Sequence, residues 1–425
     1  MNIHTLLSIV ADQREELSAK DYSELCLRPE ESQLDLKSNL AQVVIGVRRC
    51  GKSTLCEMFL KQQGINFAYV NFDDNRMENM KSSDLDNLLE ALYMTYGEFK
   101  YLFLDEIQNI EGWPLFVNRL LRQKIHLFIT GSNSKLLSNE LSTHLTGRNN
   151  KVELYPFSFY EYCKIKKIDL SSLSTKSKGL RKGTLHEYLL EGGFPELLNE
   201  RNRRGYINGL LDAIIKNDIA KRFRVKNVEA LRRIAAYLAD NYCQEFVAKT
   251  IGELFSVSNH TAENYYSYLK EAFLLVGINR FSYKSKDRVR NEKIYIIDTA
   301  FVTEREDNFS LENIGWKLEN VVCIELLRRY KPLYCDIFYY KEASSQVDFV
   351  IAKDGNVKEL IQVSYEITSE KTRNREIRGL KNAAQKLKCK KLTLITFEEY
   401  ETIEEDGLTI NVIPATEWLL NKVTH

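Results

Sequence analysis

The spacing of apolar residues follows three successive patterns along this chain of 425 residues. In the first part, short apolar runs typical of buried strands alternate with segments of helical spacing, after a predicted helix over 3–20. Strands that alternate with helices predict a parallel sheet covered by helices, whose ligands lie at the carboxyl ends of the strands. The five predicted strands cover 40–47, 67–72, 101–106, 125–132 and 151–156.

The second pattern is helical. Residues 158–225 are predicted to be mostly helix, with a break at Gly192-Gly193-Phe194-Pro195. A predicted hairpin of 274–281 and 293–297 comes later, and three helices precede it. Three helices followed by a hairpin are the order of a winged helix-turn-helix. These helices are predicted over 229–242, 247–255 and 259–272.

The third pattern begins near residue 312 and predicts an α-β-β-β-α-β order, which does not continue the first sheet. A last strand over 408–413 and a short helix close the chain, and the acidic run 398–406 is predicted to be a solvated loop. A separate C-terminal domain is therefore expected. Its predicted elements cover 316–330, 336–341, 347–353, 359–366, 370–388 and 391–397.

Composition narrows the class of protein. With 44% hydrophobic and 28% charged residues, the chain is expected to be a soluble globular protein of about three domains. The eight cysteines include no C-x-x-C pair and the six histidines no H-x-x-x-H, so structural zinc is not expected. Acidic residues soon after the first apolar run argue against a signal peptide, and no stretch reaches the ~18 apolar residues of a membrane span. We therefore expect a cytoplasmic protein without membrane association.

Residues 46–53 match the phosphate-binding pattern G-x-x-x-x-G-K-S, between a predicted strand and a predicted helix. Backbone N–H groups at such a turn cradle phosphate oxygens, while Lys52 reaches the β- and γ-phosphates and Ser53 holds Mg²⁺. Cys50 is either a small filler or a thiol whose pKa the helix N-terminus lowers. The chain is thus predicted to bind ATP with Mg²⁺. The predicted nucleotide-binding residues are Gly46, Val47, Arg48, Arg49, Cys50, Gly51, Lys52, Ser53 and Thr54.

A second signal supports this prediction. The apolar run that starts at Tyr101 ends in Asp105 and Glu106, so a buried strand presents two acids at its carboxyl end. Phosphoryl transfer needs a carboxylate in the Mg²⁺ shell and a group that orients the attacking water. Asp105 is assigned the first role and Glu106 the second, which favours hydrolysis over binding alone.

Several motifs together resemble a bacterial and archaeal family of AAA+ ATPases. They are Gly46-Val-Arg-Arg-Cys-Gly-Lys-Ser, Tyr69-Val-Asn-Phe-Asp-Asp, Leu104-Asp-Glu-Ile-Gln, Thr130-Gly-Ser-Asn-Ser-Lys-Leu-Leu-Ser, Thr146-Gly-Arg, Tyr155-Pro-Phe-Ser-Phe-Tyr-Glu-Tyr and Gly192-Gly-Phe-Pro-Glu. In that family an N-terminal ATPase precedes a winged helix and a C-terminal domain related to PD-(D/E)XK nucleases.

The resemblance implies an α/β fold in which a P-loop ATPase with a parallel sheet and a helical lid precedes a winged helix and a restriction-endonuclease-like domain. The expected segments are a lead-in helix, the ATPase core, the lid, the winged helix and the nuclease-like domain. They cover 1–30, 31–157, 158–225, 226–300 and 301–425.

The resemblance also implies two further catalytic residues. Ser132, at the end of the 125–132 strand, is placed as the sensor of the γ-phosphate, with Thr130 and Asn133 as competing candidates. Arg148 stands where AAA+ proteins keep the arginine finger that they give to a neighbouring subunit, which would require a homo-oligomer. The alternative for Arg148 is a surface arginine in a turn.

The third helix of the helical section and the hairpin suggest a DNA contact. The helix is expected to expose Asn259, His260, Glu263, Asn264, Ser267 and Lys270, and to bury Tyr265, Leu269 and Phe273. A recognition helix presents such polar residues to the major groove. The hairpin places Lys284, Lys286, Arg288 and Arg290 at alternate positions, on one face if that segment is extended. Winged helices also bind proteins, and charged hairpins are often only solvated, so a protein partner stays an alternative.

The C-terminal part carries an incomplete nuclease motif. The resemblance places Glu319 on the first helix, Asp348 on the second strand and Gln362 on the third, with Ser364 where a lysine belongs. Lys371 on the next helix is the nearest candidate to replace that lysine. We expect a scaffold or binding domain, with an ATP-gated, metal-dependent nuclease as the alternative. A nucleotide switch without hydrolysis is a third possibility, which Glu106 and Arg148 disfavour.

Overall fold

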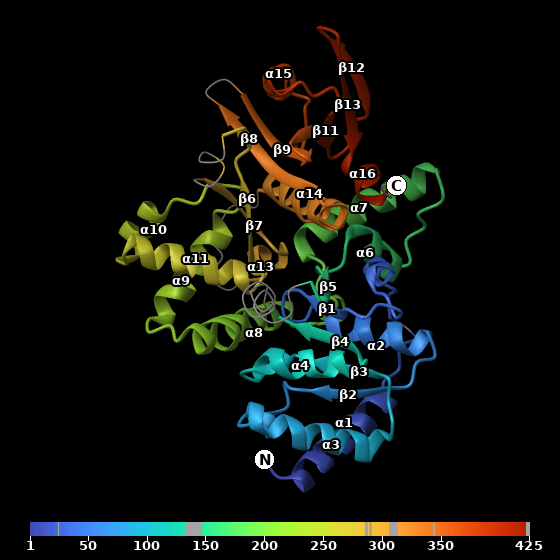
Figure 1. The fold of residues 1–425 in the computed structure, drawn as a ribbon. Coiled ribbons are helices and arrows are strands. Elements are labelled where there is room, and N and C mark those ends of the chain that lie inside the picture. Colours follow the sequence, from blue (N-terminus) through green and yellow to red (C-terminus); the bar gives the residue numbers. More distant parts are fainter. Residues whose placement is uncertain are drawn as a thin grey trace. The chain divides into compact units, whose positions relative to one another are not determined.

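The computed structural model describes residues 1–23, 25–132, 147–284, 288, 291–305, 313–342 and 345–421 (Figure 1). The chain divides into two compact units. One contains residues 1–154 with 271–273, and the other contains 155–270 with 274–425. None of the described helices is long and apolar enough to cross a membrane.

The first unit is built on a five-stranded parallel sheet, as predicted. The strands lie in the order β2-β3-β4-β1-β5, and every neighbouring pair is parallel. The carboxyl ends of β1, β3 and β4 therefore meet at one edge in the middle of the sheet. The strands are β1 (Ala41–Ile45), β2 (Phe67–Asn71), β3 (Tyr101–Asp105), β4 (His126–Gly131) and β5 (Asn149–Glu153).

The predicted lead-in helix is confirmed as α1, which packs against the edge strand β2 and against α3. The Asn2 side chain caps α1 by accepting a hydrogen bond from the Thr5 N–H at 2.8 Å. Gln13 accepts from the N–H of Asn71 at 2.9 Å and donates to its carbonyl at 3.0 Å, so α1 continues the hydrogen bonding of the sheet edge. The helices of this unit are α1 (Ile3–Ala19), α2 (Lys52–Gln62), α3 (Leu85–Tyr96) and α4 (Trp113–Arg122), with 3₁₀ turns at Pro29–Gln33, Asn75–Met77, Ser82–Asp84 and Ile107–Asn109.

The second unit begins with helices and a hairpin, in the predicted order. The hairpin strands β6 (Leu275–Asn279) and β7 (Glu292–Ile296) are antiparallel and follow three helices. The helices are α6 (Phe159–Ile165), α7 (Thr175–Glu191), α8 (Arg203–Ala213), α9 (Val228–Asp240), α10 (Ala248–Phe255), α11 (Asn259–Glu271), α13 (Ala300–Thr303), α14 (Ile314–Tyr330), α15 (Glu370–Leu387) and α16 (Ala415–Leu420). A π-helical stretch, Ile214–Lys221, follows α8, and 3₁₀ turns lie at Glu196–Leu198 and Lys331–Leu333.

The predicted helix break at Gly192-Gly193 has a packing reason. A Cβ on Gly192 would lie 1.8 Å from Asp298 Oδ1, and Gly192 also has a positive φ of 75°. The N–H of Gly193 donates to Asp298 Oδ2 at 2.7 Å, and the N–H of Ala300 donates to Oδ1 at 2.9 Å. Burial raises the pKa of Asp298 to about 6. The end of α7 is thus fixed to the segment that follows β7.

The remaining strands form one mixed sheet in the order β12-β13-β11-β10-β9-β8. β10-β11 and β11-β13 are parallel, while β8-β9, β9-β10 and β12-β13 are antiparallel. The strands are β8 (Asp336–Glu342), β9 (Ser345–Lys353), β10 (Asn356–Val363), β11 (Leu392–Thr396), β12 (Glu401–Glu405) and β13 (Leu408–Pro414).

One prediction for this sheet was wrong. The acidic run 398–406, expected to be a loop, contains the edge strand β12. Ile403 is buried in β12 and pairs with Ile410, Glu401 and Glu405 pair with Arg373 and Lys381 of α15, and Glu404 is exposed. A charged edge strand prevents unwanted strand pairing, but its composition resembles that of a loop.

Candidate nucleotide site and nuclease-like centre

The predicted phosphate loop has the backbone that phosphate binding needs. Gly51 is left-handed, with φ 98°, and precedes α2, which begins at Lys52. Gly46 is required for a different reason, because a Cβ there would lie 2.1 Å from the carbonyl oxygen of Leu154. The loop after β1 is therefore pressed against the chain that leaves β5, and the first N–H groups of α2 stay available for an anion.

Lys52 lies buried beside the second acid of the β3 edge. Its Nζ donates to the Val47 carbonyl at 3.2 Å and lies 3.4 Å from Glu106 Oε1. Burial would raise the pKa of Glu106, but the Lys52 ammonium and a hydrogen bond from Gln108 outweigh burial and hold it below its ordinary value. Glu106 is thus kept as a carboxylate, the form that a water-orienting group needs.

Asp105 collects three hydroxyl donors. Ser53 Oγ donates to its Oδ1 at 2.7 Å, Thr130 Oγ1 donates to the same oxygen, and the Tyr69 hydroxyl lies 3.3 Å from Oδ2. Burial, followed by the nearby Glu106 carboxylate, raises the pKa of Asp105 to about 6. A buried carboxylate next to a serine hydroxyl fits a magnesium ion, which prefers oxygen ligands and offsets the carboxylate charge.

The sensor candidates differ in their contacts. Thr130, on β4, donates to Asp105 and accepts from the Glu106 N–H at 3.0 Å. Ser132 is buried just after β4, and its Oγ accepts from Gln108 Nε2 at 3.4 Å. The structure therefore brings both hydroxyls to the site, while Asn133 lies outside the described residues.

Arg148 lies far from the phosphate loop of its own chain. It is exposed just before β5, and its Nη1 is 3.4 Å from Asn118 Oδ1. The β1–β5 register pairs Ala41 with Asn149, so Arg148 is at the amino end of these parallel strands. The phosphate loop follows their carboxyl end, about 16 Å away along a five-residue strand.

Cys50 is a buried filler. Its Sγ contacts the Leu154 carbonyl at 3.4 Å, and burial raises the pKa of its thiol. The alternative of a lowered pKa was therefore wrong, because loss of water outweighs the helix terminus and the nearby cations.

Two acids of the second unit, Glu319 and Asp348, converge on a lysine that the sequence did not suggest. Lys293 Nζ, from β7, lies 2.6 Å from Glu319 Oε1 on α14 and 3.2 Å from Asp348 Oδ1 on β9. The Tyr295 hydroxyl also donates to Glu319, at 2.7 Å. All four residues are buried. An ammonium group thus stands between the two acids that a nuclease would use for metal.

Electrostatics favour a charged Lys293. Burial alone would lower the pKa of the Lys293 ammonium, but the carboxylates of Asp348 and Glu319 outweigh burial and raise it. Burial and the Asp348 carboxylate raise the pKa of Glu319 to about 7. A protonated lysine between two acids brings the cluster close to neutrality.

Gln362 hydrogen-bonds to other groups than Lys293. Its Oε1 accepts from the Asp348 N–H at 3.1 Å, and its Nε2 donates to Glu376 at 2.8 Å. The Ser364 hydroxyl donates to the Glu366 carbonyl, and Lys371, the candidate substitute, is exposed. Among the described residues, no group of three or more His, Cys, Asp or Glu side chains is arranged to hold a metal ion.

The DNA-contact candidates are described only in part. On α11, Asn259, His260 and Glu263 are exposed, whereas Asn264, Ser267 and Lys270 are half-buried. Lys270 pairs with Glu292 at 2.6 Å. Tyr265, Leu269 and Phe273 are buried, as expected. In the hairpin, Lys284 is exposed and Arg288 half-buried, while Lys286 and Arg290 lie outside the described residues.

Comparisons with known proteins agree with the geometry of the first unit. Residues 38–163 match a family model described as an AAA domain. The chain is 35% identical over 407 residues to an uncharacterized protein of Methanocaldococcus jannaschii, covering 91% of this chain and 90% of that protein. It is 33% identical over 399 residues to an uncharacterized protein of Haemophilus influenzae, covering 90% of this chain and 95% of that protein. The chain belongs to the family of these two proteins.

The residues that match the AAA domain contain the whole nucleotide site. Sequence and geometry therefore both indicate a nucleotide-binding ATPase domain. Residues 182–310 and 315–418 match two domains of unknown function, DUF8612 and DUF4143. A solved structure entitled Thermotoga maritima RuvB Holliday junction branch migration motor matches at 14% identity, covering 64% of this chain and 93% of that chain. Its TM-score is 0.29.

Sequence reasoning missed several contacts in both centres. In the AAA domain, Tyr69 and Gln108 lie within the motifs that carried the family resemblance, so motif position was a usable signal. Lys293 had no such signal, because its partner Asp348 is 55 residues away in sequence. Only the folded chain brings it between the acids.

Proposed function

We propose that this protein is a Mg²⁺-dependent ATPase. The observation that supports this most strongly is the convergence of Lys52, Ser53, Asp105 and Glu106 at the carboxyl edge of β1 and β3. One ammonium, one hydroxyl and two carboxylates are the groups that phosphoryl transfer to water needs.

Each residue has a separate role in the proposal. Lys52 binds the β- and γ-phosphate oxygens, and Ser53 and Asp105 would hold Mg²⁺, which neutralises charge on the triphosphate. Glu106 orients the attacking water, and Gln108, which donates to both Glu106 and Ser132, positions the Glu106 carboxylate. Gln108 is a positioning residue in this scheme, since it acts through Glu106.

A comparison of two variants tests the ATPase proposal. Lys52→Ala should abolish ATP binding in calorimetry, whereas Glu106→Gln should retain binding and lose turnover by roughly 10²–10⁴. Lys358→Ala, on the exposed face of β10, serves as a control for loss of a lysine. Absence of any heat from ATP or ADP with folded wild-type protein would refute the proposal.

The position of Arg148 supports action in trans, and hence a homo-oligomer. Because it lies at the opposite strand end from its own phosphate loop, any role in catalysis must involve a neighbouring copy. A mixture of Arg148→Ala and Lys52→Ala protein should recover part of the ATPase rate, as one intact site forms at a mixed interface. Two results together would contradict a shared site. The mixture would be as inactive as each variant alone, and the ATPase rate per chain of wild-type protein would not depend on protein concentration.

We further propose that the C-terminal sheet is a binding or scaffold domain without nuclease activity. Lys293 supports this, because its ammonium lies at the point where two acids would hold a metal. The expected result is no cleavage of plasmid or linear DNA with Mg²⁺ or Mn²⁺. Cleavage that disappears in Asp348→Ala would favour the ATP-gated nuclease instead.

Contact with DNA by α11 and the hairpin is the proposed task of the winged helix, with a protein partner as the alternative. The exposed polar face of α11 and the basic residues Lys284 and Arg288 support it. Duplex binding should weaken steeply with salt, because counterions are released from phosphates. Salt-insensitive binding, or none to any duplex, would favour the protein partner.

A further inference from the structure

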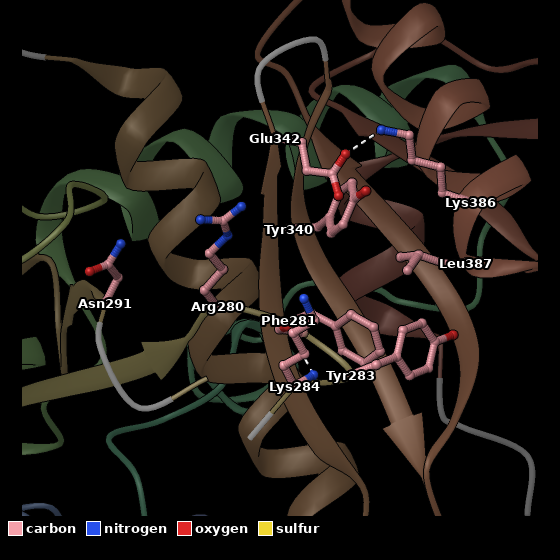
Figure 2. Close-up of a pocket in the computed structure, with 10 residues that line it drawn as sticks. Arg280, Phe281, Tyr283, Lys284, Asn291, Tyr340, Glu342, Lys386 and Leu387 are labelled. Atoms are coloured by element: carbon pink, nitrogen blue, oxygen red, sulfur yellow. Dashed lines mark hydrogen bonds and ion pairs between the residues drawn. The ribbon is translucent and has the colours of Figure 1, made fainter. Parts of the chain in front are cut away.

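A cavity lies where the chain leaves β6 and crosses the C-terminal sheet. The N–H of Phe281 donates to the Tyr339 carbonyl at 2.6 Å, and Arg280 forms a β-bridge with the same residue of β8. This crossing leaves a cavity of about 670 Å³ between the 280–284 segment, β8 and the end of α15 (Figure 2). That volume is in the range of sites for small molecules and nucleotides.

Aromatic rings form one wall of the cavity. Tyr283 is 67% exposed, and its ring rests edge-on against Phe281, with centroids 5.2 Å apart. Phe281 in turn packs edge-on against Phe338 of β8 at 5.5 Å and is buried in the core of the C-terminal sheet. The exposed tyrosine thus stands on a rigid base, which lowers the entropy cost of stacking a ligand on it.

The residues that line the cavity include more cations than acids. Glu342 is the acid among the lining residues, and both the Lys386 ammonium and the Tyr340 hydroxyl are bound to it. The Lys386 hydrogen bond holds the pKa of Glu342 below its ordinary value. In the part of the chain that the structure describes, neither Arg280 nor Lys284 has a carboxylate within ion-pair distance. Arg280 attracts Glu342 only at longer range, so among the described residues Arg280 and Lys284 are two lining cations that can meet an anionic ligand.

We propose that this cavity binds single-stranded nucleic acid, with phosphates at Arg280 and Lys284 and a base stacked on Tyr283. Sites for single strands combine basic groups that follow the backbone with aromatic rings that stack on bases. A duplex offers phosphates but no free base face, so the exposed ring favours an unpaired strand. The proposal deepens the nucleic-acid contact proposed for the hairpin and rests on it, since both use Lys284.

Fluorescence anisotropy with labelled 15-nucleotide oligo-dT and oligo-rU, and with a 15-base-pair duplex, tests the proposal on the full chain. Tyr283→Ala should weaken single-strand binding by about 5–150-fold, whereas Tyr283→Phe should retain it because the ring remains. Arg280→Gln should reduce the salt slope by about 0.7. Tyr334→Ala, at an 89% exposed tyrosine elsewhere in the same unit, and Lys358→Gln are matched controls. Thermal unfolding of each variant checks that it folds.

The outcomes separate this proposal from the broader one. The cavity site is supported if the protein binds oligo-dT, oligo-rU or both, and if Tyr283→Ala loses this binding while Tyr283→Phe and Tyr334→Ala keep it. The oligonucleotide that binds then shows which sugar the site accepts. Duplex binding without single-strand binding refutes the cavity site but leaves the hairpin–duplex contact intact. Absence of binding to all three probes refutes both. Single-strand binding that is equal in Tyr283→Ala and wild type also refutes the cavity site.

Discussion

Replacing Lys293 tests whether the buried cluster of Lys293, Glu319 and Asp348 depends on an ammonium group. In Lys293→Met the buried acids Glu319 and Asp348 lose the cation that lies 2.6 Å and 3.2 Å from them. Removing one partner of a buried charge cluster costs about 3–5 kcal/mol, because a charge is left in a low dielectric without compensation. For a unit of this size that corresponds to a drop of roughly 6–20 °C in the unfolding midpoint.

The loss of stability in Lys293→Met should depend on pH. The pKa of Glu319 is already raised, from 4.5 to about 7, and loss of Lys293 should raise it further. A carboxyl group with a raised folded pKa binds its proton more tightly in the folded state, so stability falls as pH rises through that pKa. The Lys293→Met penalty should therefore be smaller near pH 5, where Glu319 is protonated and only Asp348 loses its counter-ion, than near pH 8.

Differential scanning calorimetry of the variant and of wild-type protein across this pH range checks this result. Glu319→Gln in the Lys293→Met background should recover part of the lost stability at high pH, since one uncompensated charge is removed. Lys358→Met, at an exposed lysine of β10, should leave the midpoint within about 1–2 °C of wild type. A Lys293→Met protein with unchanged, pH-independent stability would refute the assignment of Lys293 as the counter-ion.

Three other changes have defined outcomes. Gly46→Ala should weaken ATP binding about ten- to hundredfold in calorimetry. The added Cβ would lie 2.1 Å from the Leu154 carbonyl oxygen, so the loop must shift, and such overpacking costs about 1–3 kcal/mol. Unchanged affinity would show that the loop has room. Gln108→Ala should lower the ATPase kcat while leaving the Kd for ATP unchanged, since it acts on Glu106; an equal loss of binding would contradict a positioning role. Asp298→Asn should cost about 1–3 kcal/mol near neutral pH, because an amide cannot accept from both the Gly193 and Ala300 N–H groups. Wild-type stability should fall between pH 4 and about 6 as Asp298, whose folded pKa is raised, loses its proton, and thermal melts of Asp298→Asn should lack that component.

The sequence by itself determined the parallel sheet, the order of elements and the phosphate loop of the AAA domain. Strand and helix spacing are local properties, and a phosphate loop needs its glycines, lysine and serine at fixed separations, so the pattern is visible without the fold. Thr130, Tyr69 and Gln108 could be found only as members of motifs. Their contacts with Asp105 and Glu106 depend on which strands lie side by side.

Only the tertiary structure decided the character of the C-terminal centre. Lys293 reaches Asp348 across 55 residues, and no periodicity or spacing encodes such a contact. The edge strand β12 could not be predicted for a related reason. Its one buried side chain, Ile403, stands in an acidic segment and gives no alternating pattern. The cavity beside Tyr283 likewise exists only because the chain leaving β6 pairs with β8. Local spacing sets the elements, but burial and charge compensation between distant elements set what their side chains can do.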